Sequence, residues 1–381
     1  MDQSSREFMV FVKPVGADCN LRCRYCYYLD KAKVYKHKGS IMMPDEVLEK
    51  YIIRQIQAST DNNIMFTWHG GEPVLAGLGF FRKVVNLQQK HRPSGKKIIN
   101  GIQTNATLLN DDWCHFFADE GFFVGVSIDG PEELHNKLRV LKDNKGSFKK
   151  TITGYELLQK YNVQTEILTV VSSENVNFPL KVYRFLKQLG SSYLTFLPLV
   201  EKDPGSDSGV SVNSVPSAAF GSFLRAIFDE WVARDISRIK IQIIEEATRT
   251  AFNQDHTLCI FKKSCGGVPV VEHNGDFYSC DHFVDANHLI GNITRTSLED
   301  LLDSDEQQAF GQAKYTTLPK YCLDCEVIDM CNGECPKNRF IKTPSGESGL
   351  NYLCPGYRRF FNHITPFVDA ISAEWAKQIN R

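Results

Sequence analysis

The chain has 381 residues, of which 42% are hydrophobic and 11% aromatic, a composition typical of a globular protein with a sizeable core. Its 44 Lys and Arg residues are balanced by 45 Asp and Glu residues, so we expect neither nucleic-acid nor membrane-surface binding, because both need a basic excess. No apolar run reaches the roughly 18 residues of a membrane span. The segment Met1–Glu7 carries acids and lacks the apolar core of a signal peptide, so we expect a cytoplasmic protein.

From residue 8 to about residue 200, short runs rich in β-branched and aromatic residues alternate with longer amphipathic segments. The expected strands are Phe8–Lys13, Asn63–His69, Lys97–Thr104, Phe122–Ile128, Gln164–Val171 and Ser192–Pro198. The expected helices are Pro44–Ser59, Gly77–His91, Asn110–Glu120, Phe148–Tyr161 and Asn177–Leu189. Strands that alternate with helices predict a parallel sheet with right-handed crossovers. A closed barrel needs eight such units, so we predict an α/β fold with a partial (β/α)6 TIM-like barrel.

The remainder of the chain differs in character. The polar, Gly- and Ser-rich segment Lys202–Val215 indicates a loop that ends the barrel, and helices are expected at Ala218–Arg234 and Ile243–Asn253. Between Cys259 and Cys354 we expect irregular structure in which metal ligation replaces an apolar core. Gly356–Ile379 predicts a helix or a broken helical pair. We therefore divide the chain into a barrel, a linker with helices, an irregular metal-binding domain and a C-terminal helical segment, at residues 1–200, 201–255, 256–355 and 356–381.

Twelve cysteines in a chain without an export signal are expected to bind metal or do redox work rather than form disulfides. Cys19, Cys23 and Cys26 form a C-x3-C-x2-C triad just after the first strand. Three thiolates can hold three irons of a 4Fe–4S cube and leave the fourth iron open. The alternative is a zinc site with a remote fourth ligand, for which His37 is the first candidate.

This triad, with Tyr25 before its last cysteine, resembles the signature of the radical S-adenosylmethionine enzymes. The resemblance implies that the three cysteines carry a 4Fe–4S cluster, whose open iron is chelated by the methionyl end of S-adenosylmethionine. Cleavage of that cofactor would release a 5′-deoxyadenosyl radical. Cofactor contacts implied by the resemblance, mostly at strand ends, come from Tyr25, Gly70, Gly71, Glu72, Ser127, Arg139 and Val200.

The glycine-rich run and Arg139 have ordinary alternatives. The run His69-Gly70-Gly71-Glu72-Pro73 resembles the family's Gly-Gly-Glu-Pro motif, in which Glu72 would meet the methionyl amine and the glycines would allow close approach to the ligand; alone it would be a Gly-rich turn. Ser127 and Arg139 would hold the methionyl carboxylate, although an Arg in a loop is commonly a solvated charge. Val200 would contact the nucleoside through its backbone.

Eight further cysteines lie between Cys259 and Cys354. On spacing alone, zinc knuckles are an alternative, but beside the triad the pattern resembles the iron–sulfur SPASM extension of peptide-modifying radical enzymes. The resemblance implies two auxiliary 4Fe–4S clusters, hence three clusters in all, with ligands Cys259, Cys265, Cys280 and Cys335 for the first and Cys322, Cys325, Cys331 and Cys354 for the second. Cys114, between Trp113 and Phe116, is expected to be a buried small hydrophobe.

The run Cys280–Val284, with Leu289–Ile293 after it, resembles the anaerobic sulfatase-maturating enzymes, which oxidise a Cys or Ser side chain of a sulfatase polypeptide to Cα-formylglycine. The resemblance implies that Asp281 takes the substrate proton; the alternative is that it orients the Cys280 loop. His282, on a strand, would point to the opposite face and be structural. Tyr28 and His69 could line the peptide site, with aromatic packing as the simpler role for Tyr28.

The partners implied are an unfolded or nascent sulfatase polypeptide and an electron donor such as flavodoxin or ferredoxin, with the enzyme a monomer. One rival hypothesis is another SPASM enzyme that forms thioether or carbon–carbon crosslinks. Many of those carry an N-terminal peptide-recognition domain, for which a strand beginning at about residue eight leaves no room. The other rival is a non-enzymatic zinc or iron–sulfur regulator, which the Gly70–Pro73 and Ser127 matches disfavour.

Overall fold

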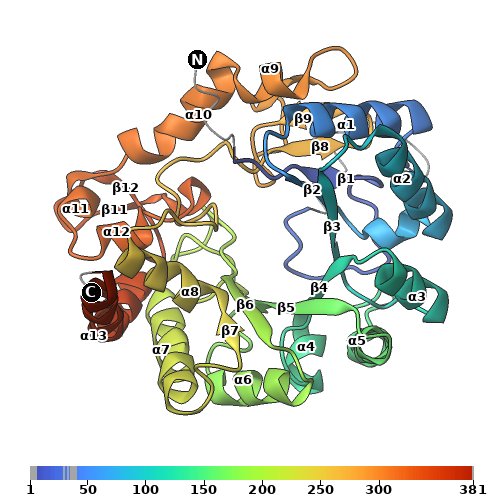
Figure 1. Cartoon of the computed structure of the whole chain (residues 1–381). Helices are drawn as coiled ribbons and strands as arrows, with labels where there is room; N and C mark the ends of the chain where they lie inside the picture. Colours follow the sequence, from blue (N-terminus) through green and yellow to red (C-terminus); the bar gives the residue numbers. More distant parts are fainter. Residues whose placement is uncertain (1–6, 29–30, 32–33, 35–40, 380–381) are drawn as a thin grey trace. The chain divides into compact units, whose positions relative to one another are not determined.

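The computed structural model describes residues 7–28, 31, 34 and 41–379 (Figure 1). His37, the candidate zinc ligand, and most of the segment assessed for a signal peptide lie outside the described residues. The chain forms two compact units. The first comprises Met1–Ser127, Leu138–Thr165 and Gly266–Gly311, and the second Ile128–Lys137, Glu166–Cys265 and Gln312–Arg381. Within the described ranges, no helix is both long enough and apolar enough to cross a membrane.

The strands of the first unit run in the order β10-β9-β8-β1-β2-β3-β4. β1 to β4 are parallel, β8 joins β1 in parallel, and β9 and β10 continue the sheet antiparallel. Parallel packing brings the carboxyl ends of β1 to β4 to one edge, where the cysteine triad and the Gly-Gly-Glu-Pro run follow. The bounds are β1 Phe11–Lys13, β2 Asn63–Trp68, β3 Lys97–Thr104, β4 Phe123–Ser127, β8 Val270–Glu272, β9 Asp276–Tyr278 and β10 Leu289–Asn292.

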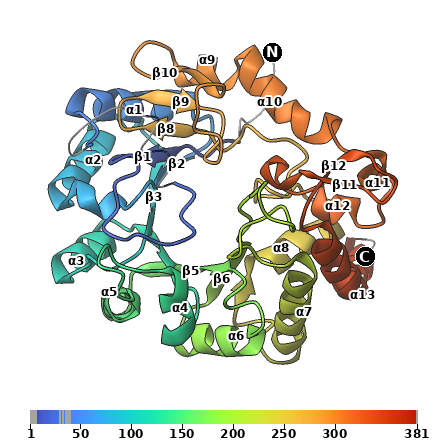
Figure 2. The ribbon, with the colours of Figure 1, turned by 180° about the vertical axis from the view of Figure 1, so that it is seen from behind.

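Helices cover one side of these parallel strands (Figures 1 and 2). Trp68 at the end of β2 is fully buried, and its ring lies edge-on to Tyr51, Phe80 and Phe81 of the covering helices. Its indole N–H donates to Asn100 Oδ1 at 3.0 Å, so the polar atom is satisfied inside the core. The helices of this unit are α1 Asp45–Ala58, α2 Leu78–His91, α3 Asp111–Asp119, α5 Phe148–Lys160 and α9 Leu298–Leu302, with a 3₁₀ turn η2 at Pro73–Ala76.

The second unit has its own parallel strands, β5, β6 and β7, and a long C-terminal helix. α13 approaches α7 closely at Gly221 and Gly356. A Cβ on Gly221 would lie only 2.5 Å from the carbonyl oxygen of Gly356. The elements are α4 Glu132–Leu138, β5 Gln164–Val171, α6 Pro179–Gln188, β6 Tyr193–Pro198, α7 Ser217–Arg234, β7 Lys240–Ile241, α8 Gln242–Arg249, η3 Thr250–Phe252, α10 Asp305–Thr316, α11 Lys320–Leu323, α12 Ile328–Cys331, η4 Pro336–Asn338, β11 Ile341–Lys342, β12 Ser348–Leu350 and α13 Cys354–Ile379. α10 begins in the first unit, as do the first two residues of β5.

The predicted strands and helices up to residue 200 are confirmed, with ends that differ by at most three residues. The region Cys259–Cys354 is irregular over more than half of its length, but it also contains the short strands β8 to β12 and the 12-residue helix α10, which the sequence did not predict. Short strands with no regular alternation gave no sequence signal there. Residues 266–311 pack in the first unit although we placed them in a 256–355 domain, and the domain boundaries stay a prediction.

Candidate active site

The cysteine triad lies in the loop after β1. Cys23 is buried, Cys19 and Cys26 are half-buried, and Cys23 and Cys26 both help to raise the pKa of Cys19. Burial, followed by the charge of Glu72, raises the pKa of Cys19 to about 12. A thiol in that environment is protonated until a metal displaces its proton, so these three donors suit a thiolate-bound cluster.

The Gly-Gly-Glu-Pro run folds against this cysteine loop. Gly71 N–H donates to Gly16 O at 2.9 Å, and Glu72 N–H donates to Asp18 O at 2.8 Å. A Cβ on Gly71 would lie 2.1 Å from Asp18 O, and one on Gly70, whose φ is +126°, would lie 2.8 Å from Gly16 O. In this structure the glycines are therefore required for contact between two loops, whereas the sequence suggested contact with a ligand.

Gly71→Ala should therefore displace the Asp18–Cys19 backbone and cost the triad its cluster. We expect the variant to lose the iron that the triad is predicted to bind and, with it, S-adenosylmethionine cleavage. Gly79→Ala is the matched control, because Gly79 is in α2 and a Cβ there meets nothing within 4 Å. Anaerobic iron analysis compares the two variants; equal iron content in both would contradict the packing role of Gly71.

Glu72 ties the end of β3 to the same loop. Its carboxylate accepts from Thr104 Oγ1 and Asn105 N–H, each at 2.7 Å, and from Val74 N–H at 3.2 Å. Asn105 in turn donates to Asn20 Oδ1 at 2.9 Å, beside Cys19. Burial raises the pKa of Glu72 to about 7, although these hydrogen bonds and the charge of Arg139 act in the opposite direction.

Two other predicted cofactor contacts lie in the same unit with defined partners. Arg139 is buried, not a solvated charge, and donates to the hydroxyl of Tyr25 at 2.7 Å. The hydroxyl of Ser127 accepts from the Gln103 amide at 3.0 Å. Val200 belongs to the second unit, where its carbonyl accepts from Lys337 at 3.3 Å.

Asp281 forms a buried ion pair in the first unit. Its carboxylate lies 2.5 Å from the ammonium of Lys13, which is fully buried at the end of β1, and it also accepts from the hydroxyl of Tyr27. Burial alone would raise the pKa of Asp281, but the charge of the Lys13 ammonium lowers it well below its usual range. The carboxylate is therefore held ionised.

The residues around this pair are aromatic or titratable. Lys13 Nζ lies 3.4 Å from Nδ1 of His69 and 4.4 Å from the ring centroid of Tyr28. Burial, followed by the charge of Lys13, lowers the pKa of His69 to about 3, so the ring is neutral. The imidazole stacks on Phe11 with centroids 4.5 Å apart.

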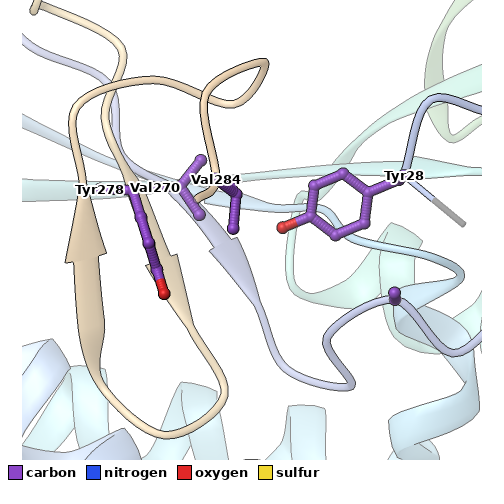
Figure 3. Packing of buried hydrophobic residues seen from close by; sticks show 5 residues of the cluster. Tyr28, Val270, Tyr278 and Val284 are labelled. Atoms are coloured by element: carbon purple, nitrogen blue, oxygen red, sulfur yellow. The ribbon is translucent and has the colours of Figure 1, made fainter. Parts of the chain in front are cut away.

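Tyr28 has a packing role, as the simpler interpretation of the sequence suggested. Its ring points toward Val284 and the strands that carry Val270 and Tyr278, and it forms a buried cluster with them (Figure 3). Its hydroxyl donates to the carboxylate of buried Glu272. His282 was expected to point away from Asp281 because both would lie on a strand, and this is wrong, since residues 281 and 282 form a turn. The ring centroids of His282 and Tyr27 are 4.9 Å apart.

The four thiols predicted for the second auxiliary cluster line one pocket of the second unit, together with apolar Val327 and Ile328. Burial raises the pKa of Cys354 to about 11 and that of Cys331 further. Four thiols around one cavity are a donor set that fits an iron–sulfur cluster. Among the described residues, no three His, Cys, Asp or Glu side chains are placed to hold a single metal ion.

Of the ligands predicted for the first auxiliary cluster, Cys259, Cys265 and Cys335 belong to the second unit, where all three oppose the lowering of the Lys314 pKa by burial. Cys280, their predicted fourth partner, belongs to the first unit. The expectation for Cys114 is confirmed, because it is fully buried in α3.

Comparison with known proteins identifies two domains in this chain. Residues 14–186 match the Radical SAM superfamily, and residues 265–326 match an iron–sulfur cluster-binding domain, SPASM. A serine-type anaerobic sulfatase-maturating enzyme of Bacteroides thetaiotaomicron is 42% identical, over 98% of this chain and 93% of its own length. A cysteine-type enzyme of Clostridium perfringens is 32% identical, over 94% and 96%.

The chain belongs to the anaerobic sulfatase-maturating enzymes. It is a radical enzyme of the oxidoreductase type, with an α/β radical SAM fold, a partial open barrel and a C-terminal SPASM domain. A solved structure described as native anSMEcpe with bound AdoMet and Cp18Cys peptide matches with a TM-score of 0.87 and 30% identity, over 96% of this chain and 99% of that one.

For this sulfatase-maturating enzyme, sequence reasoning missed two residues that contact Asp281. Lys13 ends an otherwise apolar strand, and a charge in that position is a signal for a buried partner. Tyr27 follows directly after Cys26, but nothing in the local sequence indicates that it reaches residue 281.

Proposed function

We propose that this enzyme oxidises the Cβ of a Cys or Ser side chain in an unfolded or nascent sulfatase polypeptide to Cα-formylglycine. The proposal rests on the similarity to serine- and cysteine-type enzymes over nearly the whole chain and on the carboxylate of Asp281 held ionised beside Cys280. We further propose three 4Fe–4S clusters, reduction by a donor such as flavodoxin or ferredoxin, and action as a monomer.

Oxidation of a Ser side chain to the aldehyde removes one hydrogen atom from Cβ, one proton from the hydroxyl and one electron. A Cys side chain loses a hydrogen atom from Cβ, a proton from the thiol and an electron, which leaves a thioaldehyde. Water then converts the thioaldehyde to the aldehyde with release of hydrogen sulfide. When bound, S-adenosylmethionine and the clusters supply the 5′-deoxyadenosyl radical and accept the electron. The protein must then position the side chain and take the proton.

Asp281 is the proposed proton acceptor, because the buried ammonium of Lys13 keeps it anionic and Tyr27 fixes the orientation of its second oxygen. Neutral His69 lies next to the Lys13 ammonium and is a candidate to contact the peptide. Cys19, Cys23 and Cys26 would hold the radical cluster. Tyr25, Gly70, Gly71, Glu72, Ser127, Arg139 and Val200 would form the S-adenosylmethionine site.

Mass spectrometry of sulfatase-motif peptides tests this function. Peptides with Cys, Ser or Ala at the target position are incubated anaerobically with reconstituted enzyme, reductant and S-adenosylmethionine. We expect an aldehyde in the Cys peptide, the Ser peptide or both, with 5′-deoxyadenosine formed in proportion, and an unchanged Ala peptide. A thioether or carbon–carbon crosslink in place of the aldehyde would show a different peptide modification.

A further inference from the structure

Lys314, near the end of α10, is a buried cation in the second unit. Lys314 is only 1% exposed, and its ammonium donates to the main-chain carbonyls of Cys259 and Ile260, both at 2.8 Å. A buried ammonium is costly unless opposite charge lies near it. Neutral carbonyls satisfy its hydrogen bonds but do not balance its charge.

The charges that act on Lys314 come mainly from thiols. Burial lowers the pKa of Lys314, and among the charges that oppose this shift those of Cys265, Cys259 and Cys335 are the largest, followed by that of the buried carboxylate of Glu334. Glu334 is itself engaged, because it accepts from the amides of Asn338 and Asn351. The three thiols are the ligands assigned to the first auxiliary cluster, so Lys314 faces that cluster's position.

A second cation extends the same environment. The guanidinium of Arg339 donates to the carbonyls of Lys314, Gly333, Asn332 and Glu334, and the charges of Cys265 and Cys322 act on it. Because Cys322 is assigned to the second cluster, Arg339 is within electrostatic reach of both ligand sets. Removing Arg339 would break several main-chain hydrogen bonds, whereas Lys314 offers a cleaner test.

We propose that Lys314 is a fixed positive charge that raises the reduction potential of the first auxiliary cluster and so favours its acceptance of the substrate electron. A nearby cation stabilises the reduced, more negative cluster over the oxidised one. In this step one electron leaves the substrate radical and reduces the cluster by one electron. The hydrogen atom goes to the 5′-deoxyadenosyl radical and the proton to Asp281. This inference rests on the proposed function, but its test needs no peptide.

The test is a redox titration of the reconstituted holoenzyme, followed by electron paramagnetic resonance. The radical cluster is recognised because S-adenosylmethionine changes its signal. For Lys314→Met we expect about a tenfold lower ratio of reduced to oxidised auxiliary cluster at a fixed potential, a shift of about 59 mV to more negative potential for one electron. Lys314→Arg should keep the wild-type value. Lys263→Met removes an exposed lysine two residues from Cys265 and should shift the potential little, because water screens it.

Lys314→Gln covers the case in which the Met variant loses iron, because its amide can still donate to the Cys259 carbonyl. A neutral variant with full iron content and an unchanged potential would overturn the proposal. So would loss of the cluster in every neutral variant, since the lysine would then serve assembly. If the potential shifts as expected but no aldehyde forms from any peptide, the proposed function fails while this inference stands.

Discussion

Replacing Cys19, Cys23 and Cys26 together with alanine should abolish 5′-deoxyadenosine formation while most of the iron stays bound. The eight auxiliary cysteines lie outside the β1 loop, and four of them line a pocket of the other unit. Wild-type enzyme with three 4Fe–4S clusters should contain about twelve irons and the triple variant about eight. Anaerobic iron and sulfide analysis, with chromatography of the cleavage products, measures both quantities.

Cys114→Ala is the control for this experiment. Its thiol is fully buried in α3 and belongs to neither ligand group, so the variant should keep about twelve irons and normal cleavage. Persistent 5′-deoxyadenosine formation in the triple variant would refute the assignment of the radical cluster. A wild-type content of about four irons with bound zinc would refute the auxiliary clusters.

The barrel elements were predictable because their signals are local. Lys97–Thr104 and Gln164–Val171 are long β-branched strands, and their bounds in the structure match the sequence prediction. The helix predicted at Pro44–Ser59 shortens to Asp45–Ala58, with Pro44 as its N-cap. Periodicity and capping residues specify such elements without any tertiary contact.

What the sequence could not show depends on distant contacts. β8 is three residues long and fully buried, and it is held by its parallel pairing with β1 more than 250 positions earlier. The Lys13–Asp281 ion pair depends on the same strand pairing. The pairing of β8 with β1 brings the segment that contains β8, β9 and Asp281 beside the end of β1. The resemblance to the SPASM enzymes implied the ligand sets, but the cysteine pattern contained no information about the charges of Lys13 and Lys314.

Asp281→Asn should reduce formylglycine formation by roughly 10²–10⁴-fold, the effect of losing a positioned general base, while S-adenosylmethionine cleavage continues. Cleavage would then run uncoupled from product. The structure adds a second consequence, because the amide leaves the fully buried Lys13 ammonium without its counter-charge. Breaking a buried pair costs about 3–5 kcal/mol, so the single variant should also unfold at lower denaturant concentration.

A double variant separates the two consequences. Lys13→Met with Asp281→Asn removes both charges, so the stability lost in the single variant should largely return. If Asp281 takes the substrate proton, the double variant stays defective in aldehyde formation although it is folded and cleaves S-adenosylmethionine. If the carboxylate serves only to balance Lys13, the double variant should recover product together with stability. Loss of iron assigned to the Cys280 cluster in the single variant would instead indicate that Asp281 orients the Cys280 loop.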